Sequence, residues 1–142
     1  MRFRWLVTFG LLATLAVASG YAQTGSTMRV NVPFEFAVNN TVLPAGEYEI
    51  HDCGLEVLSL MAMRSDDSRH VVLFTGNAAS RNSAPDQSSL VFHRYGSNYF
   101  LADIWWAGVT SGLELPKSKT EKELAKTASA RRPEQVLLMA SR

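Results

Sequence analysis

Three consecutive residues, His51, Asp52 and Cys53, bring a base, a carboxylate and a thiol together in one short segment. A thiol nucleophile is activated by an adjacent base, which a carboxylate can orient. The segment 47–53 is predicted to be a strand, and successive strand side chains point to opposite faces. His51 and Cys53 would share a face while Asp52 points away, which argues against a thiol enzyme. We expect Cys53, the single cysteine, to be buried as a small apolar side chain.

The three histidines, His51, His70 and His93, fall on three different predicted strands. A small barrel could bring them together around a zinc ion, for which imidazole is a common ligand. No short spacing such as His-x-His supports this site. We therefore expect three unrelated histidines, and the sequence predicts no metal and no cofactor.

His93 and Asp103 form a more specific pair, because both lie on the clearest predicted hairpin, 89–95 with 99–106. A three-residue loop, 96–98, would place Val91 opposite Asp103 and make His93 and Asp103 diagonal neighbours on one face. A carboxylate beside an imidazole can orient it as a general base. The alternative is an ordinary cross-strand polar pair. We favour this alternative, because the pair alone specifies no reaction.

The same hairpin face carries three aromatic rings among polar groups. Its candidate binding residues are His93, Tyr95, Tyr99, Asp103 and Trp105. Aromatic rings with polar tips suit the stacking of a sugar or contact with a protein partner. The alternative is that a second sheet or the C-terminal helix covers this face.

The elements that would position these residues are short and mostly extended. Alternating or continuous apolar residues predict seven strands, at 30–38, 47–53, 55–63, 69–76, 89–95, 99–106 and 134–140. Pro33 predicts an edge position for the first strand, because proline has no N–H to donate. Tyr48 and Ile50 are the expected inward-facing residues of the second strand, and a polar loop is expected over 77–88.

Ser118 with Glu121, and Thr120 with Glu123, form two overlapping capping boxes, which predict a helix from about Lys119 to Ser129. The fold class is therefore all-β with one C-terminal helix, as an antiparallel β-sandwich or a small barrel of about seven strands.

The N-terminus has the pattern of a secretory signal peptide. Arg2 and Arg4 precede an apolar run over 5–18, and small residues at 20 and 22 precede Gln23. The run is too short for a membrane span, which needs about 20 apolar residues. We expect cleavage after Ala22, no stable membrane anchor, and one β-rich domain over 23–142 that is exported to the periplasm or the medium.

Charge excludes one class of partner. Loss of Arg2 and Arg4 leaves 12 of the 14 basic residues against 13 acidic ones. A domain so close to neutral lacks the positive field that nucleic-acid binding requires. The expected partner is a cell-envelope glycan or another exported protein.

Several motifs together resemble a family of short secreted bacterial proteins with no assigned activity. They are Pro-Phe-Glu-Phe at 33–36, Leu-Pro-Ala-Gly-Glu-Tyr at 43–48, Leu-Val-Phe-His-Arg-Tyr-Gly at 90–96, Tyr-Phe-Leu at 99–101, Ile-Trp at 104–105, and Glu-Leu-Pro-Lys-Ser at 114–118 with Glu121, Glu123 and Leu124. The resemblance covers residues 32–124. It implies export and a compact β-rich domain, and it brings no catalytic residues.

Three functions follow as hypotheses. The first is a non-enzymatic binding or interaction module that uses the aromatic hairpin face. The second is a small hydrolase or metal-dependent enzyme around His93 and Asp103. The third is a carrier that holds an apolar ligand inside a barrel. We favour the binding module and lean against an enzyme.

Overall fold

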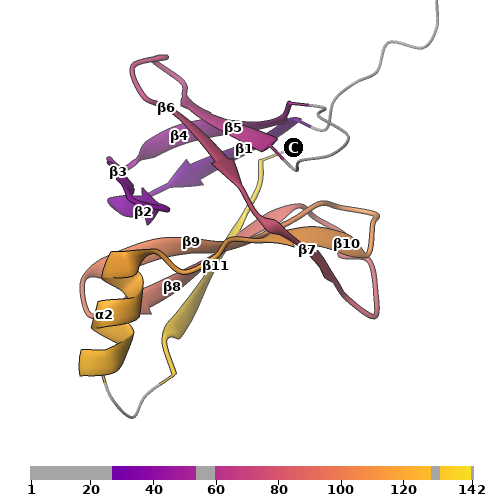
Figure 1. Ribbon diagram of the computed structural model, residues 1–142. Coiled ribbons are helices and arrows are strands. Elements are labelled where there is room, and N and C mark those ends of the chain that lie inside the picture. The colour runs from indigo at the N-terminus through magenta and orange to yellow at the C-terminus, as the bar shows by residue number, and fades with distance from the viewer. Residues whose placement is uncertain (1–26, 54–59, 129–131, 142) are drawn as a thin grey trace, which may run out of the picture.

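A computed structural model describes residues 27–53, 60–128 and 132–141 (Figure 1). The expected signal peptide, 1–22, and the first residues of the strand expected over 55–63 lie outside these ranges. The elements are β1 (Thr27–Val32), β2 (Phe36–Val38), β3 (Thr41–Leu43), β4 (Gly46–Asp52), β5 (Leu60–Ser65), β6 (Val71–Thr75), β7 (Asn77–Ser80), β8 (Ser89–Tyr95), β9 (Asn98–Trp105), β10 (Ser111–Glu114), α2 (Lys119–Thr127) and β11 (Glu134–Met139).

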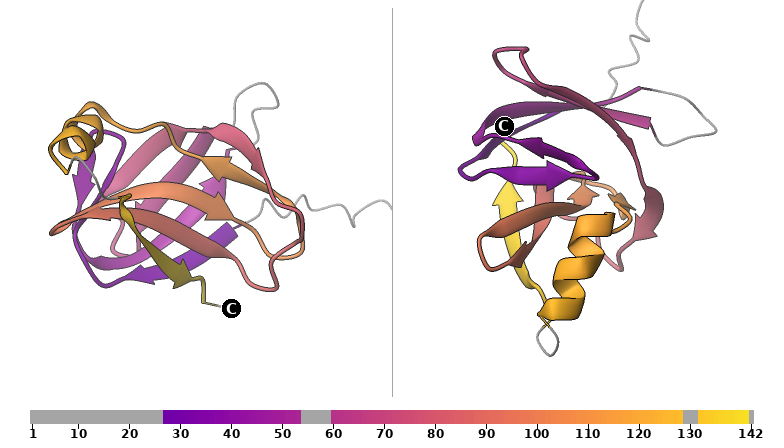
Figure 2. Two further views of the ribbon diagram at one scale, coloured as in Figure 1. Left: turned by 90° about the horizontal axis from the view of Figure 1, so that it is seen from below. Right: turned by 60° about the vertical axis from the view of Figure 1, so that its left-hand side comes forward.

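These strands form two sheets that face each other, with a single helix near the C-terminus (Figures 1 and 2). The smaller sheet has the order β1-β4-β5-β6, and the larger sheet has the order β11-β8-β9-β10-β7, with β2 and β3 added beside β9. This confirms the all-β fold class with a C-terminal helix and selects the sandwich. The barrel alternative is wrong, because the strands do not close into one sheet. The described residues contain eleven strands rather than about seven, because the strand expected over 30–38 is divided into β1 and β2, and β3, β7 and β10 form in segments expected to be connections.

The core lies between the two sheets and is filled by side chains from both. Tyr48 and Ile50 of β4 are almost fully buried, as expected, and meet Phe92 and Ile104 of the larger sheet in one apolar cluster. Aromatic contacts join the layers, since the ring of Phe36 packs edge-on against the rings of both Tyr48 and Phe92. The large buried apolar area supplies the main stabilisation of a chain without an intramolecular disulfide.

Proline divides the first expected strand. The alternation over 30–38 predicts one strand, but β1 ends at Val32 and β2 begins at Phe36 in the other sheet. Pro33 has no N–H to donate to a neighbouring strand, so pairing stops there. The chain crosses between the layers at this point. The expected edge position of the first segment is confirmed, because β1 is the first strand of its sheet.

A second crossing occurs at Gly76, between β6 and β7. β6 pairs with β5 in the smaller sheet, whereas β7 pairs with β10 in the larger sheet. A Cβ atom at residue 76 would approach the Leu113 side chain and the Glu114 carbonyl too closely, so only glycine allows this passage. The loop expected over 77–88 is therefore partly wrong, because its first four residues form β7.

The hairpin of β8 and β9 has a tighter turn than expected. Tyr95 pairs with Asn98, so the loop is the two residues Gly96 and Ser97, with Gly96 at a φ of 61°. A two-residue hairpin turn needs a positive φ at its first central position, and glycine supplies it. The predicted pairing of Val91 with Asp103 is confirmed.

The register changes along this hairpin, because a bulge lies between its two ends. Phe92 pairs with Leu101, while the preceding residue of β8 pairs with Asp103. Ala102 is therefore an extra residue in β9, and it reverses which side chains of that strand face the core.

The helix α2 begins where the capping pattern predicts. Ser118 is the N-cap, and its hydroxyl accepts a hydrogen bond of 3.1 Å from the Glu121 N–H. Leu124 and Ala125 pack on a small cluster formed by Ala37, Tyr95 and Phe100 on the outer face of the larger sheet. The sequence predicts a thin apolar stripe of Leu124, Ala125 and Ala128; the first two residues pack beside that sheet (Figure 2), whereas Ala128 is exposed. Among the described residues, no helix has the length and hydrophobicity to cross a membrane.

Candidate functional site

Four of the five predicted binding residues share the outer face of the larger sheet, which is largely covered. Tyr95 and Trp105 are buried, and His93 and Asp103 are partly buried. The aromatic surface expected from the sequence is therefore not open, because α2 and the Arg81 side chain lie over it.

Tyr99 does not belong to this face. The bulge at Ala102 turns Tyr99 toward the space between the sheets, where its ring stacks on Phe34 with centroids 3.7 Å apart and an interplanar angle of 13°. The expectation that it shares a face with Tyr95 is wrong. The predicted register assigned residues 99–101 to the wrong sides, because a regular three-residue loop was assumed.

Buried Tyr95 and Glu121 and partly buried His93 form a polar group, here named the His93 cluster. The His93 Nδ1–H donates to Glu121 Oε1 at 2.9 Å, and the Tyr95 hydroxyl donates to the same oxygen at 3.2 Å. Glu121 is 4% exposed. Burial, followed by the nearby Glu121 carboxylate, raises the pKa of Tyr95 to about 12. The cluster therefore joins α2 to β8 by polar contacts under the helix.

Asp103 does not orient His93 by a direct hydrogen bond, since the His93 Nδ1 bonds to Glu121. Asp103 lies directly opposite Glu114 of β10, which places two carboxyl groups side by side. Burial and the Glu114 charge raise the pKa of Asp103, while His93 and Arg81 oppose this shift. His93 and Asp103 are therefore diagonal neighbours across β8 and β9, as predicted. They form an ordinary cross-strand polar pair rather than a carboxylate-oriented base.

Trp105 is held between a glycine and an arginine. Its ring covers Gly112, where any Cβ atom would collide with it, and the Arg81 guanidinium lies 4.0 Å from the ring centroid. The ring is 6% exposed, and its Nε1 has no hydrogen-bond partner among the described residues. Trp105 thus packs as a part of the sheet rather than as an open contact surface.

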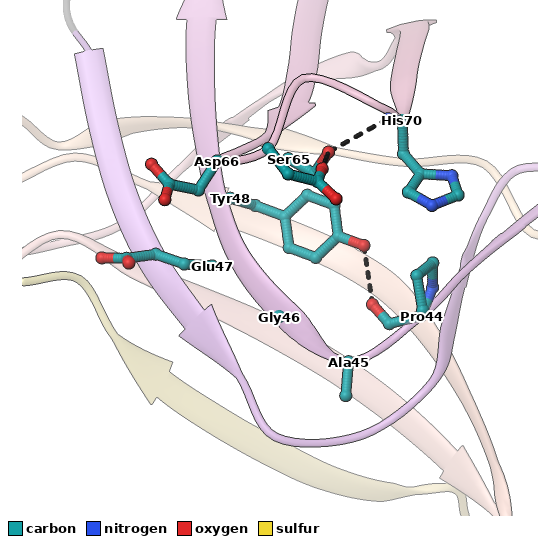
Figure 3. Close-up of a pocket in the computed structure, with 9 residues that line it drawn as sticks. Pro44, Ala45, Gly46, Glu47, Tyr48, Ser65, Asp66 and His70 are labelled. Carbon is teal, nitrogen blue, oxygen red and sulfur yellow. Dashed lines mark hydrogen bonds between the residues drawn. The ribbon is translucent and has the colours of Figure 1, made fainter.

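A hollow at the other sheet is lined with groups suited to ligand binding. This acidic pocket is lined by Pro44, Ala45, Gly46, Glu47, Tyr48, Ser65, Asp66, Asp67 and His70, and has a volume of about 250 Å³. Figure 3 shows Tyr48 between the Pro44 segment and the Ser65 segment. The Tyr48 hydroxyl donates to the Pro44 carbonyl at 2.6 Å and fixes the wall formed by the β3–β4 connection (Figure 3).

The turn between β5 and β6 forms the opposite wall. The Ser65 hydroxyl donates to Asp67 Oδ1 at 2.5 Å, and the His70 backbone N–H donates to the Ser65 hydroxyl at 3.0 Å (Figure 3). The Ser65 hydroxyl and the Arg69 backbone N–H hold the pKa of Asp67 below its usual range. Serine donates directly to the carboxylate, so histidine does not activate it as in a catalytic triad. Asp67 is an ionised hydrogen-bond acceptor at the pocket.

The remaining chemistry-bearing residues stay apart. His51 lies beside Thr27 Oγ1 at 3.2 Å and Glu49 Oε2 at 3.4 Å, and Cys53 is exposed. The expected burial of Cys53 is wrong, because it follows the last residue of β4. Within residues 27–53, 60–128 and 132–141, no group of three or more histidine, cysteine or acidic residues is arranged to hold a metal ion.

Comparison of the chain with protein-family models, with curated proteins and with solved structures gives no match.

Sequence reasoning missed the role of Glu121. It assigned this residue to a capping box, but the carboxylate bonds to His93 and Tyr95 in the sheet. A usable signal was present, because residues 121, 124, 125 and 128 follow the spacing of one helix face. A carboxylate on an apolar helix face must find buried partners. No comparable pattern identified the pocket, because its walls come from two separate hairpins.

Proposed function

We propose that this chain is an exported, non-enzymatic binding module whose ligand site is the acidic pocket. The observation that carries the proposal is the combination of carboxylates, an imidazole and an apolar wall around a space of about 250 Å³. Sites for drug-sized ligands range from about 300 to 1,000 Å³. The pocket therefore suits one sugar ring or one side chain, rather than a long ligand.

A saccharide fits the chemistry of the two walls. Sugar hydroxyls donate to carboxylates, and Glu47, Asp66 and Asp67 provide these acceptors. Pro44 and Ala45 offer apolar surface for the C–H groups of a sugar ring. This supports a terminal sugar of a cell-envelope glycan as the ligand.

A cationic side chain of an exported protein is the second candidate, because three carboxylates line the pocket. The other hypotheses have less support. The His93 side chain is engaged with Glu121, which argues against a general base oriented by Asp103. The space between the sheets is filled by packed side chains, which argues against a carrier.

The test begins with the protein expressed from its full sequence and purified from the exported fraction. N-terminal sequencing is expected to begin at Gln23. Calorimetric titration with neutral sugars, amino sugars and lysine- or arginine-containing peptides is then compared between the protein and Asp66→Asn. We expect one ligand class to bind with a Kd between about 1 μM and 1 mM, and the substitution to weaken it at least about tenfold, or about 1.4 kcal/mol.

The matched control is Asp86→Asn, which removes the charge of an exposed aspartate outside this pocket. It should leave binding unchanged. Absence of binding by every class, or equal binding by the protein and Asp66→Asn, would refute the assignment of the pocket.

A further inference from the structure

The strand β6 has an open hydrogen-bonding edge. It is the last strand of the smaller sheet and pairs only with β5 there. The Ser65 N–H donates to the His70 carbonyl at 2.9 Å, which sets the alternation of backbone groups along the hairpin. Two residues on from His70, the backbone groups of Val72 again face β5, whereas those of Val71 and Leu73 face away. Among the described residues, no strand pairs with this outward edge.

The neighbouring strand ends before it can cover the edge. β10 pairs with β7, and its last pair is Glu114 with Asn77. The next residue, Leu115, donates its N–H to the Ala102 carbonyl of β9 at 2.7 Å, and Pro116 has no N–H to offer. β6 and β7 form one bent segment (Figure 1). The edge of this segment that faces away from β5 is paired with β10 along β7 and is unpaired along β6.

The side chains on β6 do not protect this edge. Val71 is 57% exposed and Leu73 is 61% exposed on the outer face of the sheet. None of the five residues of β6 is charged. Natural edge strands are commonly protected from pairing by lysine, proline, inward-pointing charges or a covering element. An unprotected apolar edge has the chemistry of a strand that accepts another strand.

We propose that β6 pairs antiparallel with β6 of a second copy of this chain, about a two-fold axis beside Leu73. The pattern of the strand is self-complementary, since Leu73 would lie opposite Leu73 of the second copy, and Val71 opposite Thr75 of the second copy. An interface of this kind uses the same patch on both subunits. The two smaller sheets would then form one continuous eight-stranded sheet.

The cross-strand rows of the sheet favour this occupant. The row through the axis contains Ala62 and Leu73 on each side, and both are uncharged. Arg64 of the adjacent strand β5 is opposite Val71 and is engaged by Glu49 at 3.4 Å, on the side away from the edge. Arg64 of the second copy would lie at the opposite end of the paired strands, because the two-fold axis is beside Leu73. The pairing therefore joins apolar side chains without bringing like charges together.

The expected affinity is low, because only five residues pair on each side. Stable dimers bury about 1,200–2,000 Å², and one short edge contributes less. We therefore expect a concentration-dependent dimer that dissociates in the micromolar to millimolar range. Sedimentation equilibrium of the protein, expressed from its full sequence, over about 10 μM to 1 mM tests this expectation.

Leu73→Lys places two ammonium groups opposite each other and should weaken the dimer at least about tenfold. The matched control is Leu137→Lys, at a side chain that is 51% exposed on β11 at the edge of the other sheet. It should leave the dimer unchanged. Equal melting temperatures of the two variants exclude misfolding as the cause.

A cross-linking measurement does not depend on the folding of the lysine variant. Leu73→Cys in a Cys53→Ser background should form a cross-linked dimer with a short bifunctional maleimide, whereas Val71→Cys in the same background should give much less. A monomer at every concentration, a dimer unaffected by Leu73→Lys, or a dimer lost in Leu137→Lys would overturn the proposal. Pairing of β6 with a strand of a different protein, without self-association, would also overturn it. The test is independent of ligand binding at the acidic pocket.

Discussion

Removal of the Glu121 carboxylate by Glu121→Ala should destabilise the protein far more than its surface-helix position suggests. The side chain is almost fully buried and accepts hydrogen bonds from His93 Nδ1 at 2.9 Å and from the Tyr95 hydroxyl at 3.2 Å. The substitution leaves two polar groups under the helix without their partner. It also removes the polar contacts that join α2 to β8, so only the small apolar cluster would hold the helix.

The magnitude follows from these two contacts. A hydrogen bond to a charged group contributes about 1.5–3 kcal/mol, so two such bonds set an upper range of about 3–6 kcal/mol. The His93 side chain is 19% exposed, so water can replace part of its bond. Alanine also favours the helix by a few tenths of a kcal/mol over glutamate. We therefore expect the free energy of unfolding to fall by about 3 kcal/mol.

Urea unfolding followed by tryptophan fluorescence measures this change. With a slope of about 2 kcal/mol per M, the midpoint should fall by about 1.5 M, and the melting temperature by roughly 10 °C. The matched control is Glu123→Ala, which makes the same substitution at an exposed position of the same helix. It should change the free energy of unfolding by less than about 0.5 kcal/mol.

Equal unfolding midpoints for Glu121→Ala and Glu123→Ala would refute the reasoning. That result would mean that the His93 cluster does not hold the helix in solution. Glu121→Gln provides an intermediate case, because its amide oxygen can still accept one hydrogen bond. It should lose less stability than the alanine variant, and a larger loss would contradict the assignment of both donors to the same carboxylate.

Four further predictions concern residues in or near the two candidate sites. Trp105→Ala should lower the free energy of unfolding by roughly 3–5 kcal/mol, as for a core truncation, and an unchanged melting temperature would instead identify the ring as a surface contact. The raised pKa of Tyr95, about 12 against 10 in the unfolded chain, means that stability falls as the pH rises through this interval; melts of Tyr95→Phe should lack this component. Asp103→Asn should raise the melting temperature near pH 7, because burial and the Glu114 charge raise the pKa of the Asp103 carboxyl, and a decrease would contradict this. The lowered pKa of Asp67 stabilises the fold above about pH 4, and this contribution is lost as the pH falls; Asp67→Asn should reduce the slope of acid unfolding.

Local patterns predicted those parts of the fold that depend on neighbouring residues. The alternation around Tyr48 and Ile50 correctly identified a strand and its buried face, because one face of that strand meets the core. The Ser118 cap correctly fixed the start of the helix, because the bond to the Glu121 N–H is local. These elements require no knowledge of the rest of the chain.

The errors have a different origin, because they depend on contacts between distant segments. The face of Tyr99 follows from the bulge at Ala102, and the bulge allows both Leu101 and Ile104 to face the core. A regular strand pattern contains no signal for such an extra residue. The acidic pocket has walls from two hairpins, so neither the Pro44 segment nor Ser65 identifies it alone.

Because the outer face of the β8–β9 hairpin is covered, both proposed sites involve the β5–β6 hairpin instead. Ser65, Asp67 and His70 line the pocket, and β6 begins at the next residue, Val71. The hydroxyl of Ser65 links the Asp67 carboxylate to the His70 backbone, so any substitution of Asp67 would disturb the turn and the strand that follows it. Asp66 lines the same pocket, and none of the hydrogen bonds described in this turn uses its side chain. Asp66→Asn and Leu73→Lys therefore test ligand binding and self-association separately, and a single variant that abolished both would show that the two sites act as one surface.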